Sequence, residues 1–182
     1  MKMSIVAGLF AAGLVACCGG CQQHHHAQSG LMKVGTPERA KDFSALDRFK
    51  ALEGRWEDGQ GGVLEYRVVA AGSAVEERLF PGSPHEMVTM YFTHYGDLYA
   101  THYCAGKNAP TMRGHWHEGT STWHFEHVST TNADPNTTGV MGEMMYTFVD
   151  GDTLKTSWST VKAGKNLGDG HGGVFKRVAA KR

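Results

Sequence analysis

Several residues that commonly bind metals lie close together near the start of the chain. Cys17, Cys18, Cys21 and the histidine tract 24–26 stand in the stretch LVACCGGCQQHHH, and the chain has one other cysteine, Cys104. Structural zinc sites usually pair cysteines about two to four residues apart and complete the site with a second pair of ligands. Cys17 and Cys18 are adjacent instead, so the spacing does not favour zinc. A histidine tract alone can bind metal only weakly and without selectivity.

The segment before this cluster favours a different chemistry. An almost unbroken apolar run covers residues 4–15, which is too short to span a bilayer and has the length of a signal-peptide core. Its end, LVAC at residues 14–17, resembles the lipobox of bacterial lipoproteins, in which a peptidase cuts before the cysteine that carries lipid. The sequence therefore predicts a lipoprotein signal peptide over residues 1–16, lipid attachment at Cys17 and a flexible polar tether over residues 17–35.

This anchor predicts a place in the bacterial cell envelope, with the protein facing the periplasm or the exterior and the membrane as its partner. The full chain carries 18 basic and 18 acidic residues. Loss of Lys2 with the signal peptide leaves 17 basic residues and a net charge of −1. Such a balance gives no electrostatic basis for binding nucleic acid or for a polybasic membrane patch.

A second set of candidate residues falls on the apolar faces of predicted strands. Pairing the strands across their turns places one carboxylate, Glu77, and the neighbours His102 and Cys104 among hydrophobic side chains. Buried polar groups of this kind either orient a bound molecule, with Glu77 and His102 as its polar contacts, or satisfy each other and the backbone. The predicted ligand pocket is lined by Tyr66, Glu77, Met90, His102, Cys104, Met144 and Trp158.

Three further histidines are candidates for a metal site on a polar face. A turn at Gly119-Thr120 pairs His115 with His124 and brings His117 to the same side. Such a His-x-His pattern with a cross-strand histidine could hold zinc or copper. The alternative is three solvated imidazoles, because the sequence supplies no carboxylate ligand and no supporting hydrogen-bond partner.

The element that precedes the strands is predicted to be one amphipathic helix. Thr36 and Pro37 supply an N-cap and a first helical residue, and Gly54 ends the pattern. Apolar residues recur every third position between them, at Phe43, Leu46, Phe49 and Leu52.

After Gly54 the pattern changes to short Val, Thr, Tyr and Phe-rich runs separated by glycine-bearing turns. The runs number about ten. They fall near residue 56 and over residues 63–70, 74–80, 87–94, 98–104, 111–118, 122–128, 140–149, 153–161 and 173–178. This regular meander predicts one domain over residues 36–182, a single up-and-down antiparallel β-barrel with an N-terminal helix. A two-sheet sandwich is the alternative.

The turn chemistry also predicts which residues face each other. It leaves Thr89, Thr93, Tyr99 and Thr101 on the side opposite the pocket. The expected pairs are Val68 with Glu77, Tyr66 with Leu79, Phe92 with Ala100, Met90 with His102, Val88 with Cys104, Arg113 with Glu126, Gly114 with Phe125, Trp116 with Trp123, Phe148 with Leu154, Tyr146 with Thr156 and Met144 with Trp158.

Two stretches resemble the calycins, the group of lipocalins, fatty-acid-binding proteins and nitrobindin-like barrels. They are Gly54-Arg55-Trp56 after the short helix and Phe175-Lys176-Arg177 in the last strand. The resemblance implies that Trp56 packs under Arg177, with Gly54 beside them. Nitrobindin-like barrels bind haem through a histidine, which makes His171, in the run GDGHGG, a candidate haem ligand by position; a flexible glycine loop is the alternative.

Further motifs resemble a bacterial family of calycin-like proteins of unknown function, the DUF1579-like proteins. The resemblance covers roughly residues 43–177, implies a lipocalin-like barrel and brings no established activity. The motifs are Gly72-Ser73-Ala74-Val75, Pro81-Gly82, Glu86-Met87-Val88-Thr89 and Thr101-His102-Tyr103-Cys104, followed by Asn108, Pro110 and Met112.

These observations favour a binding protein for a small, mostly apolar molecule and specify no cofactor. A barrel of this size either holds one such molecule or is filled by side chains. An enzyme is not favoured, because Gly-x-Ser-x-Gly does not occur, Ser83 has no assigned base and a lone buried thiol such as Cys104 is usually inert. The same pattern is also compatible with a haem- or metal-binding barrel, or with a structural or interaction module that has a filled interior.

Overall fold

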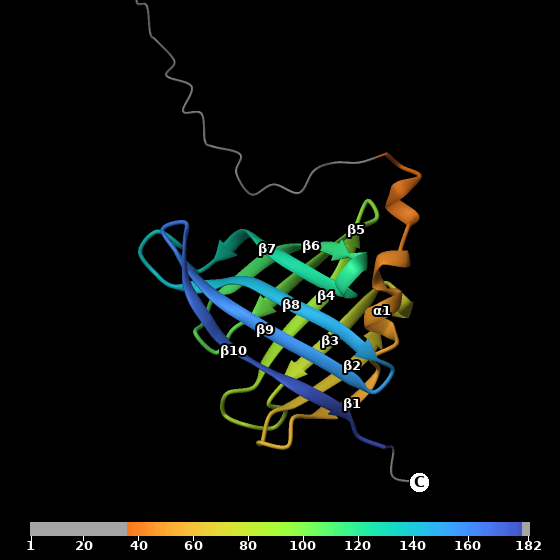
Figure 1. Cartoon of the computed structure of the whole chain (residues 1–182). Helices are drawn as coiled ribbons and strands as arrows, with labels where there is room; N and C mark the ends of the chain where they lie inside the picture. Colours follow the sequence, from red (N-terminus) through yellow and green to blue (C-terminus); the bar gives the residue numbers. More distant parts are fainter. Residues whose placement is uncertain (1–35, 180–182) are drawn as a thin grey trace, which may run out of the picture.

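The computed structural model describes residues 36–179, with the side chains of residues 169–171 outside that description. Within these residues ten antiparallel strands form a closed barrel in chain order (Figure 1), and the last strand pairs with the first. The predicted up-and-down barrel is therefore confirmed, and the sandwich is wrong. The strands are β1 (Gly54–Glu57), β2 (Val63–Val69), β3 (Ala74–Leu79), β4 (Met87–His94), β5 (Asp97–Tyr103), β6 (Ala109–His117), β7 (Thr122–Thr131), β8 (Val140–Asp150), β9 (Thr153–Lys162) and β10 (Lys165–Arg177).

The N-terminal segment is not one continuous helix. It consists of the 3-10 turns η1 (Arg39–Lys41) and η2 (Ser44–Leu46) and the single α-helical turn α1 (Asp47–Lys50). The apolar residues predicted at every third position still pack the segment onto the barrel, because Leu46, Phe49 and Leu52 are all buried in the core. Only Phe43 stays largely outside, at 38% exposure.

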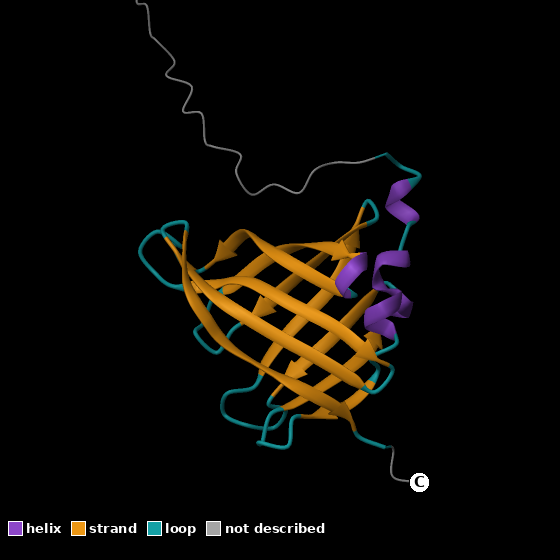
Figure 2. Cartoon of the chain, viewed as in Figure 1, coloured by secondary structure: helices purple, strands orange, loops and turns teal. Residues whose placement is uncertain are grey.

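The helical segments lie together at one end of the barrel (Figure 2), which we call the helix end. Phe49 of α1 stacks on Tyr91 of β4 with ring centroids 4.1 Å apart, and it also meets Phe125, Tyr146 and Phe148 edge-on. Aromatic pairs in these geometries are favourable beyond the area they bury. The segment therefore fills the helix end, while five strand connections form the opposite end, which we call the loop end.

The β2–β3 hairpin has a different register from the predicted one but the same inward face. Val69 pairs with Ala74 and Tyr66 with Glu77, two residues out of the expected alignment. The cause is the turn η3 (Ala70–Gly72), in which two alanines adopt left-handed φ angles and lengthen the connection. A shift by two residues keeps each side chain on its own face.

The register of the β4–β5 hairpin differs from the predicted one by one residue, so β4 turns its other face to the barrel interior. Tyr95 and Gly96, with φ of 50° and 79°, form a two-residue turn and pair His94 with Asp97. A one-residue shift exchanges the two faces of a strand. Thr89 and Tyr91 are therefore buried, and Met90 pairs with Thr101 on the outer side.

The other two predicted hairpins are correct at every expected pair. The β6–β7 pairing brings Arg113 opposite Glu126 and Gly114 opposite Phe125, and the β8–β9 pairing brings Met144 opposite Trp158. The largest boundary error is in β10, which begins at Lys165, well before the predicted residue 173. Register shifts at Asp169 and His171 let this glycine-rich stretch pair with β9.

Trp56 and Arg177 meet where the first strand pairs with the last. Trp56 of β1 pairs with Arg177 of β10, and the guanidinium lies 4.3 Å from the indole ring centroid. Arg177 also donates to the carbonyls of Ala51 and Glu53, at 2.8 and 2.9 Å. Gly54 has φ of 125°, a conformation that glycine adopts easily, and a Cβ there would lie 3.6 Å from a guanidinium nitrogen of Arg177. The last strand is thereby tied to the start of the first.

Candidate functional site

A carboxylate with three tyrosine partners occupies the centre of the barrel. Glu77 of β3 accepts hydrogen bonds from the hydroxyls of Tyr66 at 2.7 Å, Tyr91 at 2.7 Å and Tyr146 at 3.0 Å. All four residues are buried, and they come from β2, β3, β4 and β8. Buried polar groups are costly unless they are paired in this way.

The electrostatics of this cluster follow from its burial. Desolvation raises the pKa of Glu77, and hydrogen bonds from Tyr91, Tyr66 and Tyr146 oppose that rise. Burial, and then the nearby Glu77 carboxylate, hold the pKa values of the three tyrosines well above their ordinary range. Three tyrosine hydroxyls of the protein therefore already bond the Glu77 carboxylate, and Glu77 functions as a structural link across the barrel.

His102 is the other buried polar residue of the predicted pocket, and it does not pair with Glu77. Its Nδ1 lies 2.9 Å from the hydroxyl oxygen of Thr89, and hydrogen bonding by Thr89 helps to lower the pKa of Glu77. Burial lowers the pKa of His102 to about 4, so the ring is neutral.

The Nε2 atom of His102 is buried and has no hydrogen-bond partner among the described residues. His102 is the second-last residue of β5, close to the loop end. The other predicted pocket residues are divided. Met144 is buried and Trp158 packs against the core. Met90 faces outward because of the one-residue shift, and Cys104 is half-buried in a loop, where its Sγ accepts from the Gly106 amide at 3.3 Å.

The predicted metal histidines share the outer face of β6 and β7. His115 pairs with His124, and the rings of His117 and His124 lie 6.0 Å apart. The Nε2 atom of His115 lies 3.7 Å from a carboxylate oxygen of Glu126. Across residues 36–179, no group of three histidine, cysteine, aspartate or glutamate side chains is arranged to hold a metal ion.

Two sets of predicted residues fall outside the described part. For the haem candidate His171, the backbone pairs with Trp158 of β9, but its side chain is not described. Cys17, with the rest of the cysteine and histidine cluster, precedes the first described residue, as do the predicted signal peptide and tether.

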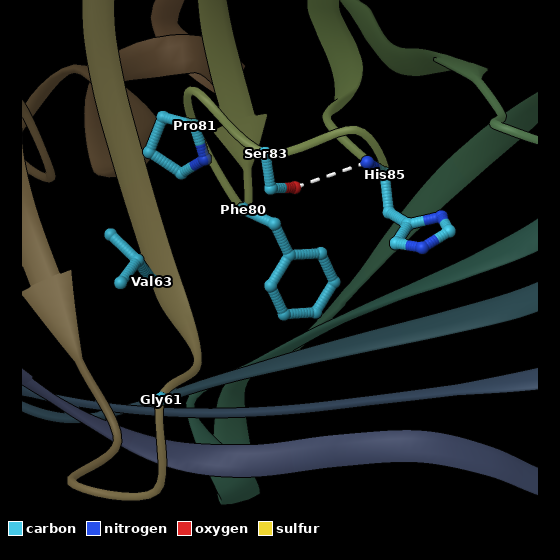
Figure 3. A pocket seen from close by; sticks show the side chains of 6 residues that line it. All are labelled: Gly61, Val63, Phe80, Pro81, Ser83 and His85. Atoms are coloured by element: carbon cyan, nitrogen blue, oxygen red, sulfur yellow. Dashed lines mark hydrogen bonds between the residues drawn. The ribbon is translucent and has the colours of Figure 1, made fainter.

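The loop end carries an apolar groove of about 510 Å³ on its rim (Figure 3). The β1–β2 turn and the loop after β3 form its two sides. Its lining residues are Gly61, Val63, Phe80, Pro81, Ser83 and His85. Mostly apolar clefts of this size with a few polar groups are the usual form of small-molecule sites.

Local hydrogen bonds hold the groove open. The amide of Phe80 donates to the carbonyl of Val63 at 3.0 Å, which fixes one side against the other. Phe80 has φ of 52° and remains 37% exposed, an uncommon backbone conformation for a bulky residue. The Glu86 carboxylate accepts from the Gly82 amide at 2.5 Å and pairs with Arg78, which braces the loop.

Ser83 and His85 both line the groove. The Ser83 hydroxyl accepts a hydrogen bond from the His85 amide at 3.1 Å, and both side chains line the cavity (Figure 3). Sequence reasoning missed this site, because the strand pattern says nothing about how two separate connections meet. The one local signal is an aromatic residue directly before Pro81-Gly82, in a position where nothing in the strand pattern buries it.

Comparisons with known proteins leave the family open: no family model matches this sequence, and a search of curated proteins found no match. The resemblance to the DUF1579-like proteins therefore stays a prediction. No helix within residues 36–179 is long and apolar enough to cross a membrane.

Proposed function

We propose that this protein binds a small, mostly apolar molecule in the groove at the loop end of its barrel. The observation that carries the proposal is the exposed Phe80 ring over an apolar cavity of about 510 Å³. Burying the exposed 37% of Phe80 against a ligand adds favourable free energy in proportion to the apolar area covered. The hydroxyl of Ser83 and the imidazole of His85 supply polar contacts that orient the guest.

The filled helix end supports the choice of this site. Phe49 fills the helix end, the Glu77 cluster occupies the barrel centre, and the Glu77 carboxylate already has three donors. A guest at that level would have to displace buried hydrogen bonds, whose loss costs about 1 to 3 kcal/mol for each unpaired group. The groove needs no such rearrangement.

Titration with the fluorescent probe N-phenyl-1-naphthylamine tests this proposal. Phe80→Asn should weaken probe binding roughly tenfold or more, because the main apolar contact is lost. Asparagine tolerates the left-handed backbone at this position, so the fold is kept. Phe43→Asn is the matched control, since Phe43 is also exposed, at 38%, but lies outside the groove. Equal affinity for both variants, or no binding by the wild-type protein, contradicts the proposal.

We also propose that the protein works as a lipoprotein of the bacterial cell envelope, held to the membrane by lipid on Cys17. The apolar run and the LVAC motif support this placement. Radiolabelled palmitate should enter the wild-type protein and not a Cys17→Ser variant. Cys104→Ser, which leaves the motif intact, is the control and should incorporate label normally. Label that persists after Cys17→Ser contradicts the anchor.

A further inference from the structure

A second cavity lies on the outer face of the barrel and is lined by His117 and His124, two of the three predicted metal-binding histidines. It has a volume of about 480 Å³ and spans the ends of β6 and β7 and the neighbouring β8 and β9. Its lining residues are His117, Thr120, Thr122, His124, Met145, Thr147, Lys155, Thr156 and Ser157.

The strand register explains why these residues meet. One outward row crosses four strands from His117 through Thr122 and Thr147 to Lys155. The adjacent row runs from His124 to Ser157 through Met145. Side chains directly opposite each other on one face of a sheet lie close enough to act on one molecule.

The charges of the cavity have one sign. Two imidazoles and the Lys155 ammonium line it, and none of its lining residues is acidic. Lys155 is exposed and makes no hydrogen bond or ion pair with the described part of the chain. The acidic residues nearest in the chain are engaged elsewhere: Glu118 bonds the indole nitrogen of Trp116, and Glu126 faces His115.

This charge pattern argues against a cation and for an anion. A metal ion between His117 and His124 would face the Lys155 ammonium with no carboxylate to balance it. An oxyanion would instead accept hydrogen bonds from both ring nitrogens and from the ammonium, which are among the stronger hydrogen bonds in proteins. The Ser157 hydroxyl stands on the same face as a neutral donor.

We propose that this outer cavity, which is separate from the groove at the loop end, binds a phosphomonoester through His117, His124 and Lys155. A phosphate group alone would leave most of the volume empty, so the ester carries an organic substituent that packs on Met145. The same chemistry occurs in free phosphate esters and in the headgroup of phosphatidic acid.

The test for a free ester is a titration of the full-length protein with phenyl phosphate. The NMR signals of the histidine ring protons report the binding. Lys155→Gln and His124→Gln should each weaken binding about fivefold at pH 7.5. His115→Gln is the matched control and should bind normally, because His115 shares the face but does not line the cavity.

The test for a lipid source uses vesicles of phosphatidylcholine with either phosphatidic acid or phosphatidylglycerol, which lacks the monoester. The protein carries Cys17→Ser, so the proposed lipid cannot contribute. Preferential sedimentation with phosphatidic acid that Lys155→Gln abolishes assigns the site to the headgroup, and binding of phenyl phosphate alone assigns it to a free ester. No binding in either arm, or equal losses for His115→Gln and His124→Gln, overturns the proposal. Neither result bears on the binding of N-phenyl-1-naphthylamine at Phe80, because the two cavities are separate.

Discussion

The hydroxyl of Tyr146 lies 3.0 Å from the carboxylate of Glu77, although the two residues are 69 positions apart in the chain. Strands β8 and β3 do not pair with each other, so this bond crosses the interior of the barrel. Tyr66 and Tyr91 complete the cluster from β2 and β4. The carboxylate thereby connects two arcs of the sheet that backbone hydrogen bonds join only around the circumference.

Removing one hydroxyl from this cluster should destabilise the fold. Tyr146→Phe should lower the free energy of unfolding by about 1.5 to 3 kcal/mol, the usual contribution of a hydrogen bond to a charged group. Urea denaturation measures the difference. Tyr103→Phe is the control, because Tyr103 is 54% exposed and its change should be within about 0.5 kcal/mol of zero. Indistinguishable stabilities for the two variants would mean that the cluster is not a structural link.

The neutral His102 should make the fold weaker in acid. Its folded pKa of about 4 lies below the ordinary 6.5, so between these values the unfolded chain binds more protons and stability falls as pH falls. From pH 7 to pH 4.5 the wild-type protein should lose roughly 2 to 3 kcal/mol through this residue. Glu77 acts in the opposite direction, because its raised pKa favours the folded state as pH falls.

A His102→Gln variant isolates this contribution, since Glu77 is present in both proteins. Unfolding at pH 7 and pH 4.5 should show that the variant lacks the acid-dependent loss seen in the wild-type protein. Parallel pH dependence of the two proteins would mean that His102 has the same pKa in the folded and unfolded states, which contradicts the lowered pKa of the buried ring.

Gly114 should tolerate no side chain. A Cβ atom there would lie 2.9 Å from the Phe125 ring and 3.0 Å from Trp123. Overpacking of this kind typically costs about 1 to 3 kcal/mol, so Gly114→Ala should lower the thermal midpoint measurably. Gly119→Ala is the control, because a Cβ there meets nothing within 4 Å. A Gly114→Ala protein as stable as the control would contradict the packing described here.

The barrel was predictable because its strands carry a period-two pattern with turn residues at their ends. The errors arose where a turn adopted an unexpected backbone conformation. The predicted three-residue turn at 95–97 is a two-residue turn with Tyr95 at φ of 50°, and that single residue moved Met90 out of the pocket and Thr89 into the core. No propensity of tyrosine indicates a left-handed φ, so the sequence does not carry this information locally.

The candidate sites were less predictable than the fold. The strand pattern correctly places Glu77 and His102 among apolar residues. It did not predict the tyrosines that bond Glu77: the β2–β3 register is shifted by two residues from the expected one, and Tyr146 is 69 positions away on β8. The groove under Phe80 depends on two connections that meet only in the folded barrel. Pairwise turn rules describe neighbours within a hairpin, and they cannot describe contacts across the interior or between loops.

The most direct test of the proposed function is to locate the bound probe by backbone amide NMR. Addition of N-phenyl-1-naphthylamine to the labelled protein should shift the amide signals of residues 61–63 and of Phe80, Gly82, Ser83 and His85, with small changes elsewhere. Shifts centred on Met144, Trp158 and His102 instead would place the guest inside the barrel and contradict the groove as the binding site. The absence of any shift would contradict the binding function itself.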